Sequence, residues 1–212
     1  MNRHVIFYHS PQSRSAGALA LLEELNADYE LHSLNLPAKE QRQAEYLKIN
    51  PMGKVPAILH DEALITEQVA VFLYMADLYA EAKLAPPIGD PLRGPYLRWM
   101  AFYGSCFEPA LIDKSLKREP ADPSVCPYGD YDTTVKTVMD QLAKGPYLLG
   151  EQFSAVDVLW GTALAWTTAF GLVPKTPVVE AYIERVTSRP AAKRAQARDA
   201  ELLAAREKAK SS

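Results

Sequence analysis

The sequence has few cysteines and no strong excess of charge. Two cysteines in 212 residues, Cys106 and Cys126, are too few for the disulfide framework of a small secreted protein, so we expect free thiols in a reducing compartment. Twenty-three basic residues against 26 acidic residues give a net charge of −3. Because binding to phosphate backbones needs a basic field, nucleic acid is not an expected partner.

Long hydrophobic runs are also missing. Near the start of the sequence the apolar run Val5–Phe7 is too short for a secretory signal. The uncharged stretch at 158–173 contains threonines and glycines and is shorter than the ~20 residues that a membrane span needs. We therefore expect a cytoplasmic protein without a membrane partner, with a buried helix over 158–173.

The sequence lacks the common motifs of metal, nucleotide and hydrolase chemistry. Its four histidines are scattered, there is no HExxH, and the cysteines do not form a CxxC pair, so we expect no metal. Gly53-Lys54 lacks the preceding glycine of a phosphate-binding loop. No G-x-S-x-G surrounds a serine, which argues against a hydrolase nucleophile.

The composition that remains, 48% hydrophobic and 23% charged, is that of an ordinary packed protein. Apolar periodicity predicts a strand, helix, strand unit followed by two strands and a helix in the first 80 residues. We expect strands at 5–8, 29–34, 55–59 and 63–65, and helices at 18–25, 39–49 and 69–76.

A proline-rich and glycine-rich stretch at 81–95 is typical of a linker, and helical spacing alone recurs beyond it. We therefore predict an α/β domain over 1–80, a linker over 81–95 and an all-helical domain over 96–212. Within the helical part we expect a long loop at 117–132 and an alanine-rich final helix at 191–212. Ser154 and Asp157 have the spacing of a capping box, which predicts a structural role for both.

Three segments could carry chemistry. The loop from His9 to Ser13 precedes the first helix, whose free N–H groups and dipole would stabilise an anion such as a thiolate. Val55-Pro56 precedes the third strand, where a cis peptide could turn the backbone toward a ligand. Thr66-Glu67-Gln68 opens the third helix and presents an acid to a cationic amine.

These segments resemble the glutathione transferase family. The matching sequence segments are FYHSPQSRS, ALALLEELNADYE and YLKINPMGKVPAILHDEALITEQVAVFLYMADLY, followed after the linker by YLLGEQFSAVDVLWG. The resemblance implies a thioredoxin-like N-terminal domain that binds glutathione as co-substrate and a helical domain that forms the wall for an electrophile. It also implies that the backbone of Val55, before Pro56, pairs with the cysteine of glutathione, while Glu67 and Gln68 hold the γ-glutamyl end.

Two positions depart from the family pattern. Gln68 stands where Ser or Thr is usual, so its amide either replaces the hydroxyl or crowds the γ-glutamyl carboxylate. The first loop has no Tyr or Cys at the position of the activating group, and two serines compete for that role. The S-P pattern favours Ser10, which we take as the first choice, whereas counting back from Asn26 at the end of the helix places the position at Gln12 or Ser13.

The activity that the resemblance implies is thiol activation followed by attack on an electrophile. Lowering the glutathione thiol pKa from ~8.5 by ~2 units needs ~2.7 kcal/mol. One hydroxyl hydrogen bond, at ~1.5–3 kcal/mol, and a helix terminus, at ~0.3–1 kcal/mol, could supply this. A serine is therefore sufficient.

Aromatic residues at helical spacing follow the linker, and such a stripe either belongs to the core or lines an acceptor pocket for a small apolar electrophile. In the second case Tyr103 and Phe107 would bind substrate. The resemblance further implies a homodimer. Two alternatives to a transferase stay open: a glutathione-dependent reductase or peroxidase, against which the missing loop cysteine counts, and a non-catalytic binding protein of the same fold.

Overall fold

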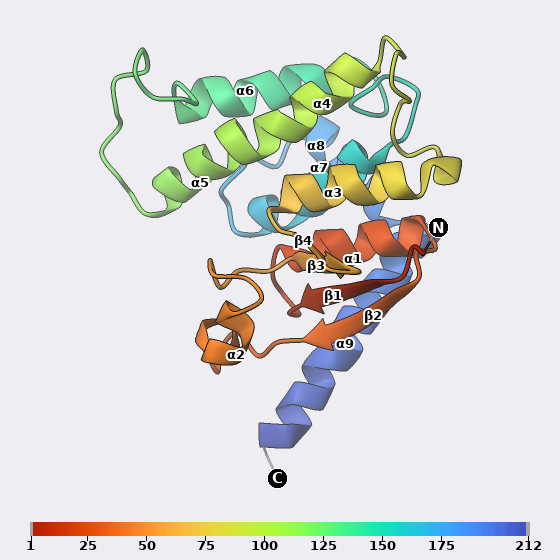
Figure 1. The fold of residues 1–212 in the computed structure, drawn as a ribbon. Helices are drawn as coiled ribbons and strands as arrows, with labels where there is room; N and C mark the ends of the chain where they lie inside the picture. The colour runs from red at the N-terminus through yellow and green to blue at the C-terminus, as the bar shows by residue number, and fades with distance from the viewer. Residues whose placement is uncertain (1, 211–212) are drawn as a thin grey trace. The chain divides into compact units, whose positions relative to one another are not determined.

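The structure, a computed structural model, describes residues 2–210 (Figure 1). By its contacts the chain divides into two compact units. The first runs to Ala82 and also takes in the chain from Ser188 onward, and the second is Lys83–Thr187. This division differs from the predicted stretches 1–80, 81–95 and 96–212 at the last helix, which packs with the first unit.

The first unit contains a four-stranded mixed sheet in the order β2-β1-β3-β4. β1 pairs in parallel with β2, while β3 is antiparallel to β1 and to β4. The side chains of Val5 and Phe7 on the central strand are buried. The strands follow one another along the chain as predicted for a thioredoxin-like domain, and they are β1 (Val5–His9), β2 (Tyr29–Ser33), β3 (Ala57–His60) and β4 (Ala63–Ile65).

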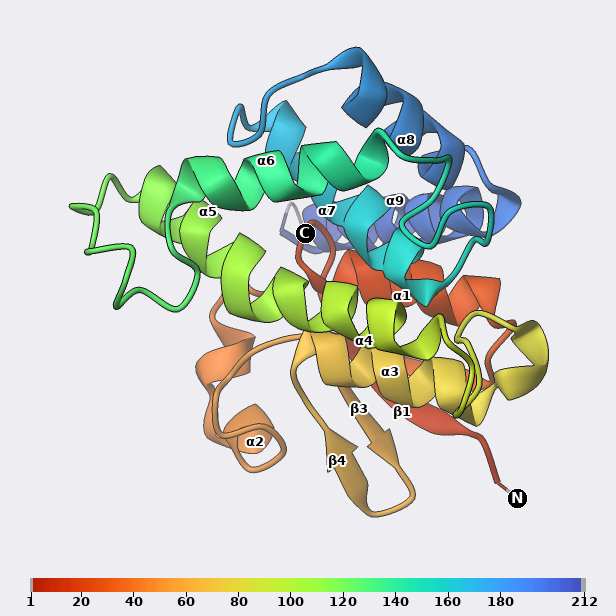
Figure 2. The same ribbon diagram turned by 90° about the horizontal axis from the view of Figure 1, so that it is seen from above.

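Two helices of this unit, α1 (Ser15–Glu24) and α3 (Gln68–Leu78), lie side by side (Figures 1 and 2). Both are rich in buried apolar residues, as their predicted periodicity requires. The helix predicted at 39–49 is instead a 3-10 turn, Glu40–Arg42, and the short α2, Ala44–Leu47. The two pieces are separated because Gln43 has extended backbone angles, φ −80° and ψ 155°.

The last helix, α9 (Pro190–Lys210), packs along α1. Its small side chains Ala191, Ala192 and Ala195 are buried. Arg189 donates from Nε and Nη2 to the two carboxylate oxygens of Glu24, the last residue of α1, at 2.6 and 2.9 Å. The alanine-rich composition predicted the helix, but Arg189 and Glu24 lie 165 positions apart in sequence and leave no local pattern.

The second unit is built from helices, as predicted. A π-helical turn, Tyr103–Phe107, joins α4 (Arg93–Phe102) to α5 (Glu108–Ser115), and Figure 2 shows the two helices running end to end. α7 is the predicted buried helix, and the ring of Trp160 lies 4.7 Å from that of Phe107 and 5.5 Å from that of Tyr103. The helices are α4 (Arg93–Phe102), α5 (Glu108–Ser115), α6 (Tyr131–Leu142), α7 (Ala155–Ala169) and α8 (Pro177–Thr187).

The capping box predicted at the start of α7 is present. The backbone N–H of Ser154 donates to Asp157 Oδ2 at 2.9 Å. The other oxygen, Oδ1, accepts from the backbone N–H of Leu148 at 2.8 Å and from the hydroxyl of Tyr182 in α8 at 2.9 Å. Burial raises the pKa of Asp157 to about 6, although these hydrogen bonds oppose the shift. The structural role predicted for this residue therefore extends beyond the cap.

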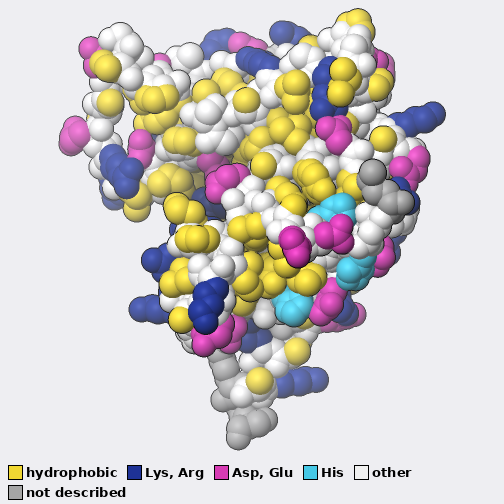
Figure 3. All heavy atoms as spheres, viewed as in Figure 1, with side chains coloured by type: hydrophobic (Ala, Val, Ile, Leu, Met, Phe, Trp, Pro, Cys, Tyr) yellow, Lys and Arg dark blue, Asp and Glu magenta, His cyan; other side chains and the backbone are white. Residues whose placement is uncertain are grey.

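Charged side chains of both signs are intermixed on the face drawn in Figure 3. Within residues 2–210, no helix combines the length and apolar character needed to cross a membrane. The same residues contain no group of three or more side chains suited to hold a metal ion.

Candidate functional site

The segments predicted to carry chemistry meet at one edge of the sheet in the first unit. β1 ends at His9, and the chain then turns into α1. β3 begins at Ala57, which pairs with Tyr8, so Val55-Pro56 lies beside the turn that follows β1. The amide nitrogen of Gln68 donates to the backbone carbonyl of Arg14 at 3.0 Å, which holds the start of α3 against the start of α1.

Val55 presents its backbone outside the sheet. The Val55–Pro56 peptide bond is cis, as the sequence suggested. The carbonyl of the preceding Lys54 is held by the Tyr46 hydroxyl at 2.7 Å and by the Asn50 amide at 2.9 Å. Among the described residues, the backbone of Val55 itself has no hydrogen-bond partner. It can therefore pair with an extended peptide.

Glu67 adopts an unusual backbone conformation at the start of α3. Its φ of 61° and ψ of 119° are rare for a residue with a side chain, and such strain is found mostly at functional sites. The side chain is exposed and does not cap the helix. Across residues 2–210 its carboxylate has no hydrogen-bond or ion-pair partner, so it is accessible to a cationic ligand group.

The two candidate serines differ in exposure. Ser10 is fully buried, and its hydroxyl accepts a hydrogen bond from Arg206 of α9 at 3.3 Å. Ser13 is partly exposed. Its hydroxyl lies 2.8 Å from the carbonyl of Ser10, to which it can donate, and it accepts from the backbone N–H of Ser15 at 3.2 Å. Ser13 is thus the more accessible hydroxyl at this helix start.

Sequence reasoning missed three residues that surround the loop. Ser15 is fully buried, and its hydroxyl lies 2.8 Å from His9 Nδ1. Asp199 of α9 accepts from the backbone N–H of Gln12 at 3.1 Å. Arg206, besides contacting Ser10, donates to the carbonyl of Leu34 at 2.9 Å. No local signal marks the last two, because both come from the far end of the chain.

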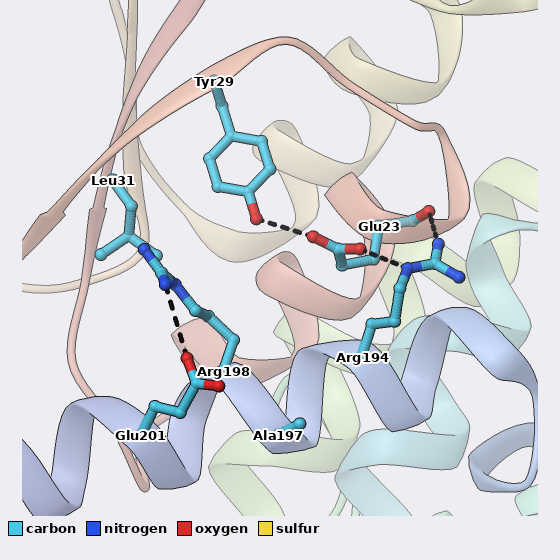
Figure 4. A pocket seen from close by; sticks show the side chains of 7 residues that line it. All are labelled: Glu23, Tyr29, Leu31, Arg194, Ala197, Arg198 and Glu201. Atoms are coloured by element: carbon cyan, nitrogen blue, oxygen red, sulfur yellow. Dashed lines mark hydrogen bonds and ion pairs between the residues drawn. The ribbon is translucent and has the colours of Figure 1, made fainter.

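A separate groove of about 470 Å³ lies between α1, β2 and α9, and none of the predicted site residues lines it (Figure 4). Its charges are largely compensated, since Arg194 binds Glu23 at 2.7 Å and Arg198 lies 3.5 Å from Glu201. Burial and the hydrogen bond to Glu23 raise the pKa of Tyr29. We therefore place the candidate site at the loop and not in this groove.

The remaining predicted residues, Tyr103 and Phe107, lie in the second unit. Each side chain is about 1% exposed and packs against Trp160. Both therefore contribute to the aromatic core of this unit. Their predicted contact with an electrophile stays a prediction.

Comparison with known proteins identifies the family of this chain. Residues 4–77 match the family "Glutathione S-transferase, N-terminal domain", and residues 132–190 match "Glutathione S-transferase, C-terminal domain". The crystal structure of a glutathione transferase from Methylococcus capsulatus is 30% identical, with a TM-score of 0.78, over 92% of this chain and 98% of that one. The chain belongs to the glutathione S-transferase family.

Two further relatives bear on activity. A sphingomonad glutathione S-transferase, solved in complex with glutathione, is 27% identical with a TM-score of 0.76, over 92% of this chain and 98% of that one. The disulfide-bond oxidoreductase YfcG of Escherichia coli is 28% identical over 198 residues, which cover 87% of this chain and 90% of that protein. The relatives of this chain are thus named for different reactions.

Proposed function

We propose that this protein conjugates the thiol of glutathione to small hydrophobic electrophiles. The observation that carries the proposal is the exposed, unpaired carboxylate of Glu67, next to a helix start that can stabilise an anion and near the unpaired backbone of Val55. A peptide with an amino group at one end and a thiol in its middle matches this set. Family membership and the glutathione-bound relative support it.

The binding roles in this proposal come from the family resemblance, and the geometry supports them. Val55 would pair its backbone with the cysteine of glutathione, as one strand of a sheet pairs with another. Glu67 would bind the α-amino group of the γ-glutamyl end through a charge-assisted hydrogen bond. Gln68 would act indirectly, because its amide donates to the carbonyl of Arg14 and so fixes the start of α3.

For thiol activation we assign Ser13 and not Ser10, which the sequence favoured. Ser10 is buried and its hydroxyl accepts from Arg206, whereas Ser13 is partly exposed at the start of α1. A hydrogen bond from the hydroxyl to the sulfur stabilises the thiolate by ~1.5–3 kcal/mol, and the helix terminus adds ~0.3–1 kcal/mol. Together these are enough to lower the thiol pKa by ~2 units from its ordinary value. The thiolate then attacks the electrophile.

The electrophile wall, the homodimer and the cytoplasmic location remain part of the proposal. The family resemblance assigns Tyr103 and Phe107 to the wall. The family resemblance supports a dimer of two copies.

The test combines glutathione binding with thiolate spectroscopy. Calorimetry should show glutathione binding, and ultraviolet titration should show a bound-thiol pKa well below that of the free thiol. Ser13→Ala should raise that pKa, and Ser10→Ala should leave it unchanged. The reverse order would reassign the activating hydroxyl to Ser10, and no thiolate in any variant would overturn the transferase.

A second candidate is disulfide reduction with glutathione, which the similarity to YfcG favours. The loop from His9 to Arg14 contains no cysteine, so any such reaction would run through glutathione itself. Assays with an aryl halide and with a small dialkyl disulfide separate the two activities. Faster turnover of the disulfide would replace the proposed reaction.

A further inference from the structure

A row of polar side chains leads from Ser13 into the interior of the first unit. The hydroxyl oxygens of Ser13 and Ser15 are 2.7 Å apart, and Ser15 Oγ is 2.8 Å from His9 Nδ1. On the other side of the ring, His9 Nε2 is 3.0 Å from Asp199 Oδ1. The row thus joins the partly exposed Ser13 to a carboxylate on α9.

The inner end of this row is not needed to cap α1. The backbone N–H of Ser15 is already bound by Ser13 Oγ. His9 is fully buried, and its Nε2 and Asp199 Oδ1 lie at ion-pair distance without the alignment of a hydrogen bond. Within residues 2–210 neither atom has a hydrogen-bond partner. Because buried polar atoms in native proteins are nearly always satisfied, this pair points to a function.

The carboxylate of Asp199 sets the direction of the row. The negative charge of Asp199 Oδ1, 3.0 Å from His9 Nε2, favours the neutral tautomer with its proton on Nε2, and Nδ1 is then the acceptor. Ser15 then donates its single hydroxyl proton to His9 Nδ1. Ser13 can in turn donate to Ser15 Oγ, at 2.7 Å, in place of the Ser10 carbonyl, which lies 2.8 Å from Ser13 Oγ. In this arrangement each hydroxyl proton points inward, toward an imidazole that can take up one more proton.

We propose that this row is a proton relay that takes up the proton of the thiol bound at Ser13; it rests on the proposed glutathione site. The S–H bond breaks and its proton forms a bond to Ser13 Oγ. The original Ser13 proton moves to Ser15 Oγ, and the original Ser15 proton moves to His9 Nδ1. The products are a thiolate and an imidazolium. The Ser13 hydroxyl now donates to the sulfur, and no proton leaves the protein.

The charges around the row suit this outcome. From α9, Asp199 faces the imidazolium at 3.0 Å, while Arg206 reaches the Ser10 hydroxyl and the Leu34 carbonyl beside the loop. At the start of α1, Arg14 adds a second positive charge, and from β1 the Phe7 ring packs 5.5 Å from that of His9. The arginines favour the thiolate and oppose the imidazolium, and the carboxylate that faces the ring compensates for them. His9, Ser15 and Asp199 are therefore positioning residues that act through Ser13.

The relay makes a prediction that simple stabilisation of the thiolate does not share. Calorimetry in buffers of different ionisation enthalpy would measure the number of protons released when glutathione binds. The pH would be about 7.5, which lies between the ordinary pKa values of imidazole and thiol. The ultraviolet band of the thiolate would show how much thiolate forms. S-methylglutathione, which has no thiol proton, gives the background. With the relay, the thiolate forms with almost no net proton release. Without it, about one proton per thiolate reaches the buffer.

Variants locate the proton acceptor. His9→Asn keeps an acceptor for Ser15 but cannot hold the proton, so proton release should rise toward about one per thiolate, and the bound-thiol pKa should rise by about one unit. Asp199→Asn keeps an oxygen for the Gln12 N–H and removes the charge that faces the imidazolium, so it should raise the same pKa. Glu201→Gln, on the same helix but paired with Arg198, is the matched control and should change neither quantity.

The outcomes separate this inference from the proposed function. If the wild-type protein forms the thiolate and releases a full proton, the relay is wrong while the transferase site stands. If His9→Asn released the same number of protons per thiolate as the wild-type protein, the relay would also be wrong. If the wild-type protein binds no glutathione, or binds it only as the thiol, the proposed function itself fails.

Discussion

Two helix starts in this chain gather hydroxyl groups around a buried ionisable side chain, and they differ in how completely its polar atoms are paired. At the start of α7, both oxygens of Asp157 accept hydrogen bonds, from Leu148, Ser154 and Tyr182. At the start of α1, His9 Nε2 faces Asp199 Oδ1 without a hydrogen bond. In the first arrangement both carboxylate oxygens are hydrogen-bonded, whereas in the second one buried pair of polar atoms is left without a hydrogen bond within residues 2–210.

The difference separates a stabilising network from a candidate reactive one. A fully satisfied buried network stabilises and rigidifies the fold, because each donor would be left unpaired if the acceptor were removed. A buried network with an unpaired polar atom lowers stability, and it persists only where the surrounding structure holds it in place. Such networks are common at functional sites. We therefore expect substitutions at α7 to change stability and substitutions at α1 and α3 to change ligand chemistry.

The largest effect should come from Asp157→Ala. This change leaves buried donors of Leu148, Ser154 and Tyr182 without an acceptor, and we expect the free energy of unfolding to fall by about 3–5 kcal/mol. Urea denaturation measures the change. Asp140→Ala, which removes an exposed carboxylate paired with Lys136 in the same unit, is the control and should cost less than about 1 kcal/mol. A variant of normal stability that has lost activity would make Asp157 catalytic.

The pH dependence of stability should report the same carboxyl group. The pKa of Asp157 is raised from its ordinary 3.8 to about 6 by burial, so folding favours the protonated form. Its stabilising contribution is present in full below about pH 4 and is lost as the pH rises through about 6. Relative to Asp157→Asn, the wild-type free energy of unfolding should fall by up to ~3 kcal/mol across this window. Parallel curves for the two proteins would show that Asp157 titrates normally.

The contrast also shows what sequence patterns can reveal. The capping box needs residues three positions apart, so Ser154 and Asp157 could be predicted, and strand and helix periodicity gave the order of the first unit. Tyr182 could not be predicted as a partner of Asp157, because it lies on another helix. Asp199 and Arg206 could not be predicted at the α1 loop for the same reason. They belong to α9, which reaches the loop through buried alanines and through contacts with residues far away in sequence. The choice between Ser10 and Ser13 depended on burial, which no spacing specifies.

At the start of α3, where the ligand is proposed to bind, Glu67→Gln should weaken glutathione binding by ~1–3 kcal/mol. This is the value of a hydrogen bond to a charged group. Thermal stability should be unchanged, because the carboxylate does not cap α3. Glu62→Gln, in the exposed turn between β3 and β4, is the matched control and should bind glutathione normally. An unchanged dissociation constant for Glu67→Gln would remove this residue from the site.

The smallest effect should come from Ser10→Ala, which tests how α9 is attached to the loop. The hydroxyl of Ser10 accepts one long hydrogen bond, 3.3 Å from Arg206, and Arg206 keeps its shorter bond to the Leu34 carbonyl at 2.9 Å. The fold also retains the Gln12 to Asp199 contact. Because alanine fits the buried position and the arginine keeps an acceptor, we expect a loss below about 1 kcal/mol in urea denaturation. A loss of several kcal/mol would show that Arg206 and Ser10, and not Asp199, join the helix to the loop, and the start of α1 would then be a stabilising network of the same kind as the start of α7.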